Sequence, residues 1–65
     1  MVLENDLARE FGVTRQAVAW TAKRRGIKRI HVHGEHGERW VLAVSDEDAE
    51  RLREIYRLRR EARRA

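Results

Sequence analysis

The sequence predicts a small α+β fold, mostly α, in the order helix, turn, helix, β-hairpin, C-terminal helix. Three observations predict it. Two short stretches with helical spacing of apolar residues are separated by a glycine; the spacing then changes to strict alternation around a second glycine-rich stretch; and a serine followed by three acidic residues opens a last, arginine-rich stretch. The 65 residues form one domain, 1–65, with the helical pair at about 4–25, the hairpin at about 28–44 and the last helix at about 46–63.

The first helix is expected to run from about Asn5 to Phe11. Residues three and four apart are neighbours on a helix, so its apolar face consists of Leu7, Ala8 and Phe11. The carboxylates of Glu4 and Asp6 are placed favourably near the positive end of the helix dipole. The sequence shows no obvious N-terminal cap for this helix.

A tight turn and a second helix follow. Gly12 can adopt the left-handed conformation that ends a helix, and the Thr14 side chain can cap the next one. Val13 is expected to fill the turn, and Ala8 is small enough for the second helix to cross close above it. This helix is expected to continue through Arg25 and to end at Gly26.

Between Lys28 and Val44 the pattern predicts two antiparallel strands. Residues 30–33 alternate apolar and polar, residues 34–37 supply a turn, and residues 39–44 are rich in strand-forming residues. Two registers remain open. A loop closed by His33 and Glu38 pairs Ile30 with Val41, and a shift by one pairs Val32 with Trp40 and turns the other side inward.

The third helix begins after Ser45. Ser45 and Asp48 approximate a capping box, and the acidic first turn suits the helix dipole. One side of the helix is apolar, with Ala49, Leu52, Ile55, Tyr56 and Ala62. The outer side carries Arg51, Arg53, Arg57, Arg60 and Arg64, which fit a solvated face, non-specific phosphate contacts or a dimer seam.

The composition favours an anionic partner. The formal net charge is +4 and the sequence pI is about 10.6, which points to a polyanion such as nucleic acid. There is no cysteine, hence no disulfide and no cysteine-based zinc site, and a reducing, cytoplasmic location associated with the nucleoid is expected. No apolar run approaches the roughly 20 residues that span a bilayer, so no membrane partner is predicted.

The spacing of Leu7-Ala8, Gly12-Val13-Thr14 and Val18 resembles that of helix-turn-helix proteins. With the hairpin and last helix, residues from about Glu4 to Leu58 resemble the compact winged helix-turn-helix domains of the MerR and phage-excisionase type. The resemblance implies sequence-specific binding of double-stranded DNA, with the second helix in the major groove and the hairpin, or wing, on flanking backbone or minor groove. It also implies a transcriptional regulator or a recombination, partition or phage accessory factor.

Carried over by position, the resemblance implies two groups of DNA-binding residues. Arg15 can offer two donors to a guanine, Gln16 can pair with an adenine, and Ala19 can contact a thymine methyl group. Phosphate contacts are expected from Lys23, Arg24 and Lys28. The expected recognition-helix set is Thr14, Arg15, Gln16, Ala19, Trp20, Lys23 and Arg24, and the expected wing and flank set is Lys28, His33, His36 and Arg39.

Two departures from the family pattern concern the second helix and the wing. The family usually has a bulky apolar residue where Thr21 stands, whereas here Trp20 carries the bulk, either in the core or under the wing, or facing DNA. Glu35 and Glu38 would repel phosphate unless they point away from it.

Functions other than DNA binding have less support in the sequence. His31, His33 and His36 with Glu35 invite a metal site, but polar residues on a solvated hairpin account for them, so no metal or other cofactor is predicted. No nucleophile stands beside a base, so no catalytic residue and no enzymatic activity are expected. The alternatives are a protein-interaction module with the same core, a non-specific architectural DNA binder, and, less favoured, an RNA binder. A homodimer and side-by-side loading on DNA both remain open.

Overall fold

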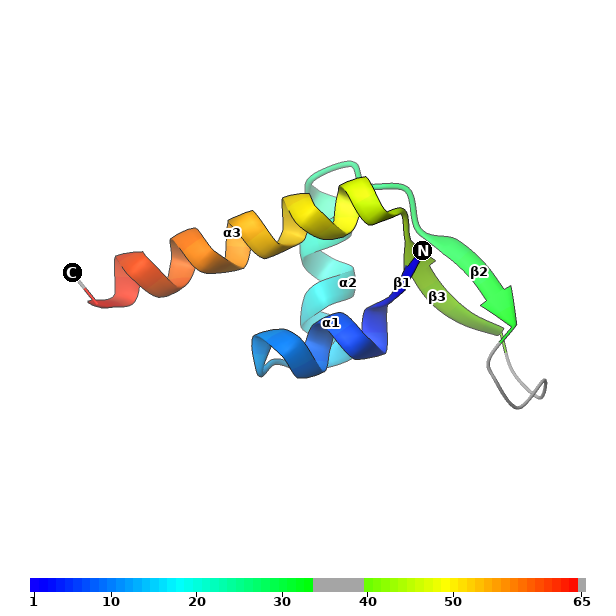
Figure 1. Cartoon of the computed structure of the whole chain (residues 1–65), viewed down its shortest axis with the longest axis horizontal. Coiled ribbons are helices and arrows are strands. Elements are labelled where there is room, and N and C mark those ends of the chain that lie inside the picture. Colours follow the sequence, from blue (N-terminus) through cyan, green and yellow to red (C-terminus); the bar gives the residue numbers. More distant parts are fainter. Residues whose placement is uncertain (34–39, 65) are drawn as a thin grey trace.

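The computed structural model describes residues 1–33 and 40–64, with the side chains of Trp40 and Arg64 excepted. Three helices and a three-stranded antiparallel sheet make a small α+β fold (Figure 1). The elements are β1 (Val2–Leu3), α1 (Glu4–Phe11), α2 (Arg15–Arg24), β2 (Ile30–His33), β3 (Trp40–Val44) and α3 (Asp46–Arg64). The expected helices and the antiparallel pairing of the two expected strands are confirmed, the expected turn at residues 34–37 lies outside the described residues, and β1 was not expected. Glu35, His36, Glu38 and Arg39 lie outside the described residues.

The turn between α1 and α2 has the predicted local chemistry. Gly12 has φ 69° and ψ 34°, in the left-handed region, and the Val13 amide donates to the Ala8 carbonyl at 3.0 Å. The Thr14 hydroxyl accepts a hydrogen bond from the Ala17 amide at 3.1 Å and so caps α2. Val13 packs against the core cluster, as expected. The two helices are thereby fixed at an angle to each other by three consecutive residues.

α2 is followed, like α1, by a glycine in the left-handed conformation. Gly26 has φ 68°, and the Ile27 amide donates to the Ala22 carbonyl at 2.9 Å. Ile27 is buried in the core cluster, so the chain turns inward directly after the helix. The predicted end at Gly26 is confirmed, with Arg25 as the terminal cap.

The sheet has the order β1-β3-β2, so β3 is central. Pairing of β2 with β3 sets Ile30 opposite Ala43 and Val32 opposite Val41. Both predicted registers are therefore wrong, by two residues and by one. The reason is loop length: the two predicted registers close the hairpin with four and five residues, whereas six residues separate His33 from Trp40. The two-residue shift leaves each side chain on the face that the first register gave it.

The N-terminal strand was missed because it has only two residues. Val2 pairs with Val44 and Leu3 with Ala43, so this short segment covers the edge of β3 that β2 leaves open. Two residues show no alternation that a sequence pattern could reveal. β1 leads directly into α1, and Leu3 occupies the cap position without a side-chain hydrogen bond, in line with the missing cap in the sequence.

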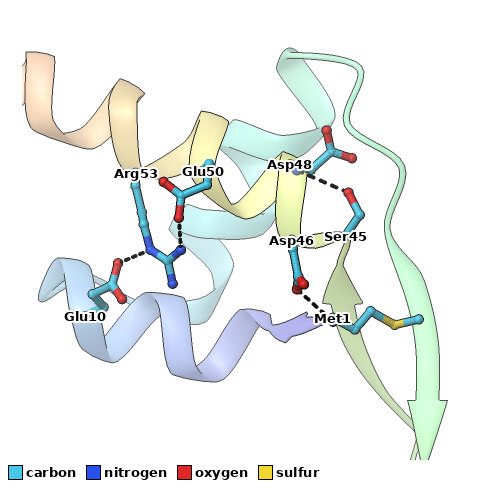
Figure 2. A network of polar contacts seen from close by, with 7 residues as sticks. All are labelled: Met1, Glu10, Ser45, Asp46, Asp48, Glu50 and Arg53. Carbon is cyan, nitrogen blue, oxygen red and sulfur yellow. Dashed lines mark hydrogen bonds and ion pairs between the residues drawn. The ribbon is translucent and has the colours of Figure 1, made fainter.

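The first half of α3 closes the core. Ser45 accepts a hydrogen bond from the Asp48 amide at 3.1 Å, which confirms the predicted cap (Figure 2). Leu52 is fully buried and packs in the core cluster, which also contains Leu7, Ala8, Val18, Ala22, Ile27, Val44 and Ala49. The Phe11 and Tyr56 rings are stacked with centroids 4.3 Å apart, and this pair joins the C-terminal end of α1 to the core part of α3.

The C-terminal end of α3 extends away from the other elements (Figure 1). Leu58 is 51% exposed, and Ala62 is exposed as well. Ala62 continues the apolar side of α3 by helix position, but it lies beyond the part of that side that is buried. None of the helices within residues 1–33 and 40–64 is long and apolar enough to cross a membrane.

Candidate nucleic-acid interface

The outward face of α2 holds most of the predicted DNA-binding residues. One hollow of about 430 Å³, here called the α2 hollow, is lined by Arg15, Gln16, Ala19, Trp20, Lys23, Arg29 and Leu42. Residues 15, 19 and 23 are four apart, and residues 16 and 20 form the adjacent row, so the helix period itself brings these five together. Arg29 comes from the segment before β2, and Leu42 comes from β3.

Trp20 faces outward rather than into the core. Its side chain is 68% exposed and lines the α2 hollow. The interpretation of Trp20 as a core residue is therefore wrong, and the inward position belongs to Thr21, which is 4% exposed. The physical reason is that Tyr56 and the stacked Phe11 supply the bulk on the inner side, so a small polar residue suffices in α2.

The Thr21 hydroxyl is fully used by its neighbours. It donates to the Ala17 carbonyl at 3.0 Å and lies 3.1 Å from the Tyr56 hydroxyl. Because a hydroxyl has one proton, the Tyr56 hydroxyl is the donor of that second bond. The Arg59 guanidinium donates to Thr21 from 3.4 Å. A threonine at this buried position is thus compatible with the core, and it links α2 to α3.

The basic residues of α2 differ from those of α3 in their partners. On α3, Arg51 pairs with Glu47 and Asp48, and Arg57 pairs with Glu54 and Glu61. The Arg57 guanidinium lowers the pKa of Glu54 by a direct hydrogen bond. Within residues 1–33 and 40–64, no carboxylate lies at ion-pair distance from any of the basic side chains on the outer part of α2, namely Arg15, Lys23 and Arg24.

Arg53 shows how the α3 charges are used internally. It pairs with Glu50 on its own helix and with Glu10 on α1, 2.7 Å away, so that it bridges two helices (Figure 2). These carboxylates raise the pKa of Arg53. The acidic residues of α3 therefore neutralise its arginines as far as Arg57, and the positive potential of α2 is not compensated in the same way.

Sequence reasoning missed Arg29 as a residue of this surface. Its guanidinium forms two hydrogen bonds with the Glu4 carboxylate, at 2.5 and 3.0 Å, and Glu4 is fully buried. The hydrogen bonds with Glu4 raise the pKa of Arg29. In the sequence, the dipole of α1 alone accounts for Glu4, whereas its main partner comes from a segment that no local pattern connects to it. Arg29 thus borders the α2 hollow, but the Glu4 carboxylate already neutralises its charge.

One face of the sheet continues this surface. His31 is opposite Leu42, and residues directly opposite each other in a sheet point to the same side. His33, two residues further along β2, shares that side. Leu42 lines the α2 hollow, so the exposed His31 and His33 emerge on the side of the sheet that α2 borders. The predicted wing residue His33 is therefore on the same side as the predicted helix residues.

The remaining predicted residues are placed as follows. Thr14 is exposed, and since its oxygen accepts the capping bond, its hydroxyl proton can still be donated to a phosphate. Lys28 is exposed in the segment between α2 and β2. His36 and Arg39 lie outside the described residues. Within the parts of the chain that are described, no three histidine, aspartate or glutamate side chains are grouped so that they could hold a metal ion.

Comparison of the chain with protein-family models, with curated proteins and with solved structures found no match.

Proposed function

We propose that this protein binds double-stranded DNA in a sequence-specific manner, as a winged helix-turn-helix domain. In this proposal α2 enters the major groove and the β2–β3 hairpin lies on flanking backbone or minor groove. The process served is the control of transcription, or an accessory role in recombination or partition, at the nucleoid in the cytoplasm.

The observation that carries the proposal is the difference in charge pairing between α2 and the part of α3 that ends at Arg57. Side-chain carboxylates neutralise Arg51, Arg53 and Arg57 on α3, whereas the described carboxylates leave Arg15 and Lys23 on α2 unmatched. Unpaired cations on an exposed helix repel one another, and a polyanion relieves that repulsion while releasing its counterions. A helix of about 10–12 Å diameter also fits the width of the major groove.

The side chains around the α2 hollow divide into two chemical roles. Arg15 and Gln16, in the first turn of α2, have the paired donors and the donor-acceptor amide that read guanine and adenine edges. Ala19 is small and half-buried, which leaves room for a thymine methyl group. Lys23, one turn later, suits a phosphate, and contacts of that kind add affinity without sequence information.

In vitro selection from a random duplex library at about physiological salt tests the proposal. We expect a motif of a few base pairs per protein, because one short helix reaches few base edges. An inverted repeat in the motif indicates a two-fold dimer, and a direct repeat indicates side-by-side loading. The affinity for the selected duplex should fall with salt with a slope of about −0.9 per phosphate contact.

Two matched arginine variants distinguish the reading of base edges from a general effect of positive charge on affinity. Arg15→Ala is expected to relax base preference at one position, at a cost of about 1–3 kcal/mol in discrimination. Arg57→Ala removes the same charge from α3, where Glu54 and Glu61 already pair with it, and is expected to leave the motif unchanged. Duplex retained without any enriched motif would indicate an architectural binder instead.

The exposed Trp20 favours one alternative, a protein-interaction module. Tryptophan is frequent at the centres of protein interfaces, and here it is 68% exposed beside Leu42. If the protein is an interaction module, it should not retain duplex DNA, or should retain it in a way that does not depend on salt. Arg15→Ala should then have no effect on DNA binding. Parallel titrations with single-stranded RNA at matched salt distinguish an RNA partner.

A further inference from the structure

A second basic hollow lies on the other side of α2, next to α3. Its volume is about 320 Å³, and it is lined by Thr21, Arg24, Arg25 and Arg59. We call it the arginine hollow. Its wall combines the last turn of α2 with the middle of α3, two segments more than 30 residues apart in the sequence. None of the expected sites included Arg25 or Arg59.

Arg59 is held in place from two directions. Its guanidinium carbon lies 5.1 Å from the centroid of the Tyr56 ring, and one of its terminal nitrogens donates to the Thr21 hydroxyl from 3.4 Å. One N–H of five is thus used, and the planar group is kept in one orientation with donors left over. The Thr21 hydroxyl cannot itself bind a ligand, because Ala17, Tyr56 and Arg59 occupy its proton and both lone pairs.

The charges of the arginine hollow have no acidic partners in residues 1–33 and 40–64. No described carboxylate lies within ion-pair distance of any of its three arginines, although Arg57, two positions before Arg59, has two such partners. The carbonyls at the end of α2 are also occupied: Thr21 and Lys23 accept from the amides of Arg25 and Gly26. Three guanidinium groups at one hollow therefore lack an anion.

The position of the arginine hollow indicates which anion fits. Successive residues on a helix are about 100° apart around its axis. Lys23, which lines the α2 hollow, therefore lies on one side of Trp20 around α2, and Arg24 lies on the other. Trp20 also lines the α2 hollow, whose other wall is the sheet. The two hollows thus flank the outward face of α2 on opposite sides, as the two phosphate backbones flank a helix seated in the major groove.

We propose that the arginine hollow binds a backbone phosphate of the same DNA duplex, through Arg59 and Arg24, on the side of α2 away from the wing. This inference rests on the proposed function. Guanidinium groups suit a phosphodiester because their parallel N–H donors match two of its oxygens. The contact fixes the position of α2 in the groove and carries no base information.

A pair of neighbouring arginines on α3 provides the test. Arg59→Gln is expected to weaken binding several-fold, equally for all duplex sequences, and to reduce the salt slope by about 0.9. Arg60→Gln is the matched control, since Arg60 carries the same charge on the next residue but lines a different hollow, with Glu10 and Phe11. Arg59 and Arg60 are both exposed, and circular dichroism checks that both variants fold.

Methylphosphonate substitution identifies the phosphate itself. Single neutral linkages are placed along each strand of the selected duplex, and the affinity of the wild type and of Arg59→Gln is measured for each. One linkage should weaken the wild type and have no further effect on Arg59→Gln, because both changes remove the same contact. Arg24→Gln should single out the same linkage.

Three results would overturn the inference, and they are distinguishable. If the wild type does not bind duplex DNA, the proposed function fails and the inference fails with it. If the wild type binds and Arg59→Gln behaves like Arg60→Gln, only the inference is wrong. If inorganic phosphate, added at constant ionic strength, binds the wild type but not Arg59→Gln while DNA affinity is the same for both, the arginine hollow is a site for free phosphate.

Discussion

The Glu4 carboxylate and the Arg29 guanidinium form a bidentate pair across 25 residues of sequence. Glu4 is 0% exposed and Arg29 is 18% exposed, so the pair is largely withdrawn from water. It ties the first residue of α1 to the segment that leads into β2. Since Arg29 also lines the α2 hollow, the pair holds one of the residues that border that hollow in place.

Removal of the Glu4 charge should strongly destabilise the fold. Glu4→Gln leaves a guanidinium of low exposure without its counter-charge, and we expect a loss of about 3 kcal/mol in the free energy of unfolding. A domain of this length has only ~3–10 kcal/mol in total. Urea denaturation measures the change. Asp6→Asn, in the same turn of α1 but exposed, is the control and should change stability by less than about 0.5 kcal/mol. Equal effects of the two variants would contradict the account of the pair.

The two leucines of α3 should behave differently on truncation. Leu52 is fully buried, so Leu52→Ala removes apolar contacts and leaves a cavity, at a cost of about 2–5 kcal/mol. Leu58 is 51% exposed, and Leu58→Ala is expected to stay within about 0.5 kcal/mol. Thermal unfolding at two protein concentrations measures both effects. A concentration-dependent loss for Leu58→Ala would show that the outer part of α3 packs against a second copy.

Trp20 should matter for binding and not for folding. Its side chain contributes little to the core, so Trp20→Ala is expected to retain the unfolding midpoint of the wild type within experimental error. On the proposed function, the same variant should bind the selected duplex at least several-fold more weakly. Acrylamide quenching of Trp20 fluorescence in a Trp40→Phe background should be strong in the free protein and reduced on the duplex. Loss of folding in Trp20→Ala would contradict the observed exposure.

The N-terminal amine makes the stability of the fold sensitive to acid through Asp46. The ammonium of Met1 lies 2.8 Å from the Asp46 carboxylate and lowers the pKa of Asp46 (Figure 2). A carboxyl whose pKa is lower in the folded state stabilises the fold above its unfolded pKa, and this contribution is lost as the pH falls through the folded pKa. Asp46→Asn should therefore melt below the wild type at neutral pH, and the difference should vanish in acid. A difference that is constant with pH would contradict the pairing.

The helices were predictable because their ends are encoded locally. Gly12, Thr14, Gly26 and Ser45 each act within four residues of their own position, through a left-handed backbone or a side-chain cap. The outward positions of Arg15, Ala19 and Lys23 follow from the helix period once the start of α2 at Thr14 is known. The bounds of the helical pair and of α3 therefore agree closely with the sequence.

The remaining features depend on partners far away in the sequence. The hairpin register depends on loop length, and the pairing of β1 depends on a strand 40 residues later. Trp20 and Thr21 could not be assigned to the outside and the inside until Tyr56 was known to fill the space behind α2. Glu4 had a sufficient local explanation, so nothing in the sequence called for Arg29 as its partner.

The contact between Met1 and Asp46 decides where an affinity tag belongs. A tag fused to residue 1 converts the ammonium into a neutral amide, removes the ion pair and extends the chain beside β1. Because Asp46 is the first residue of α3, the loss of this ion pair would destabilise the junction between β3 and α3. The far end of α3 projects away from the other elements (Figure 1), so a tag placed there would leave both hollows and the N-terminal pair intact for the binding measurements.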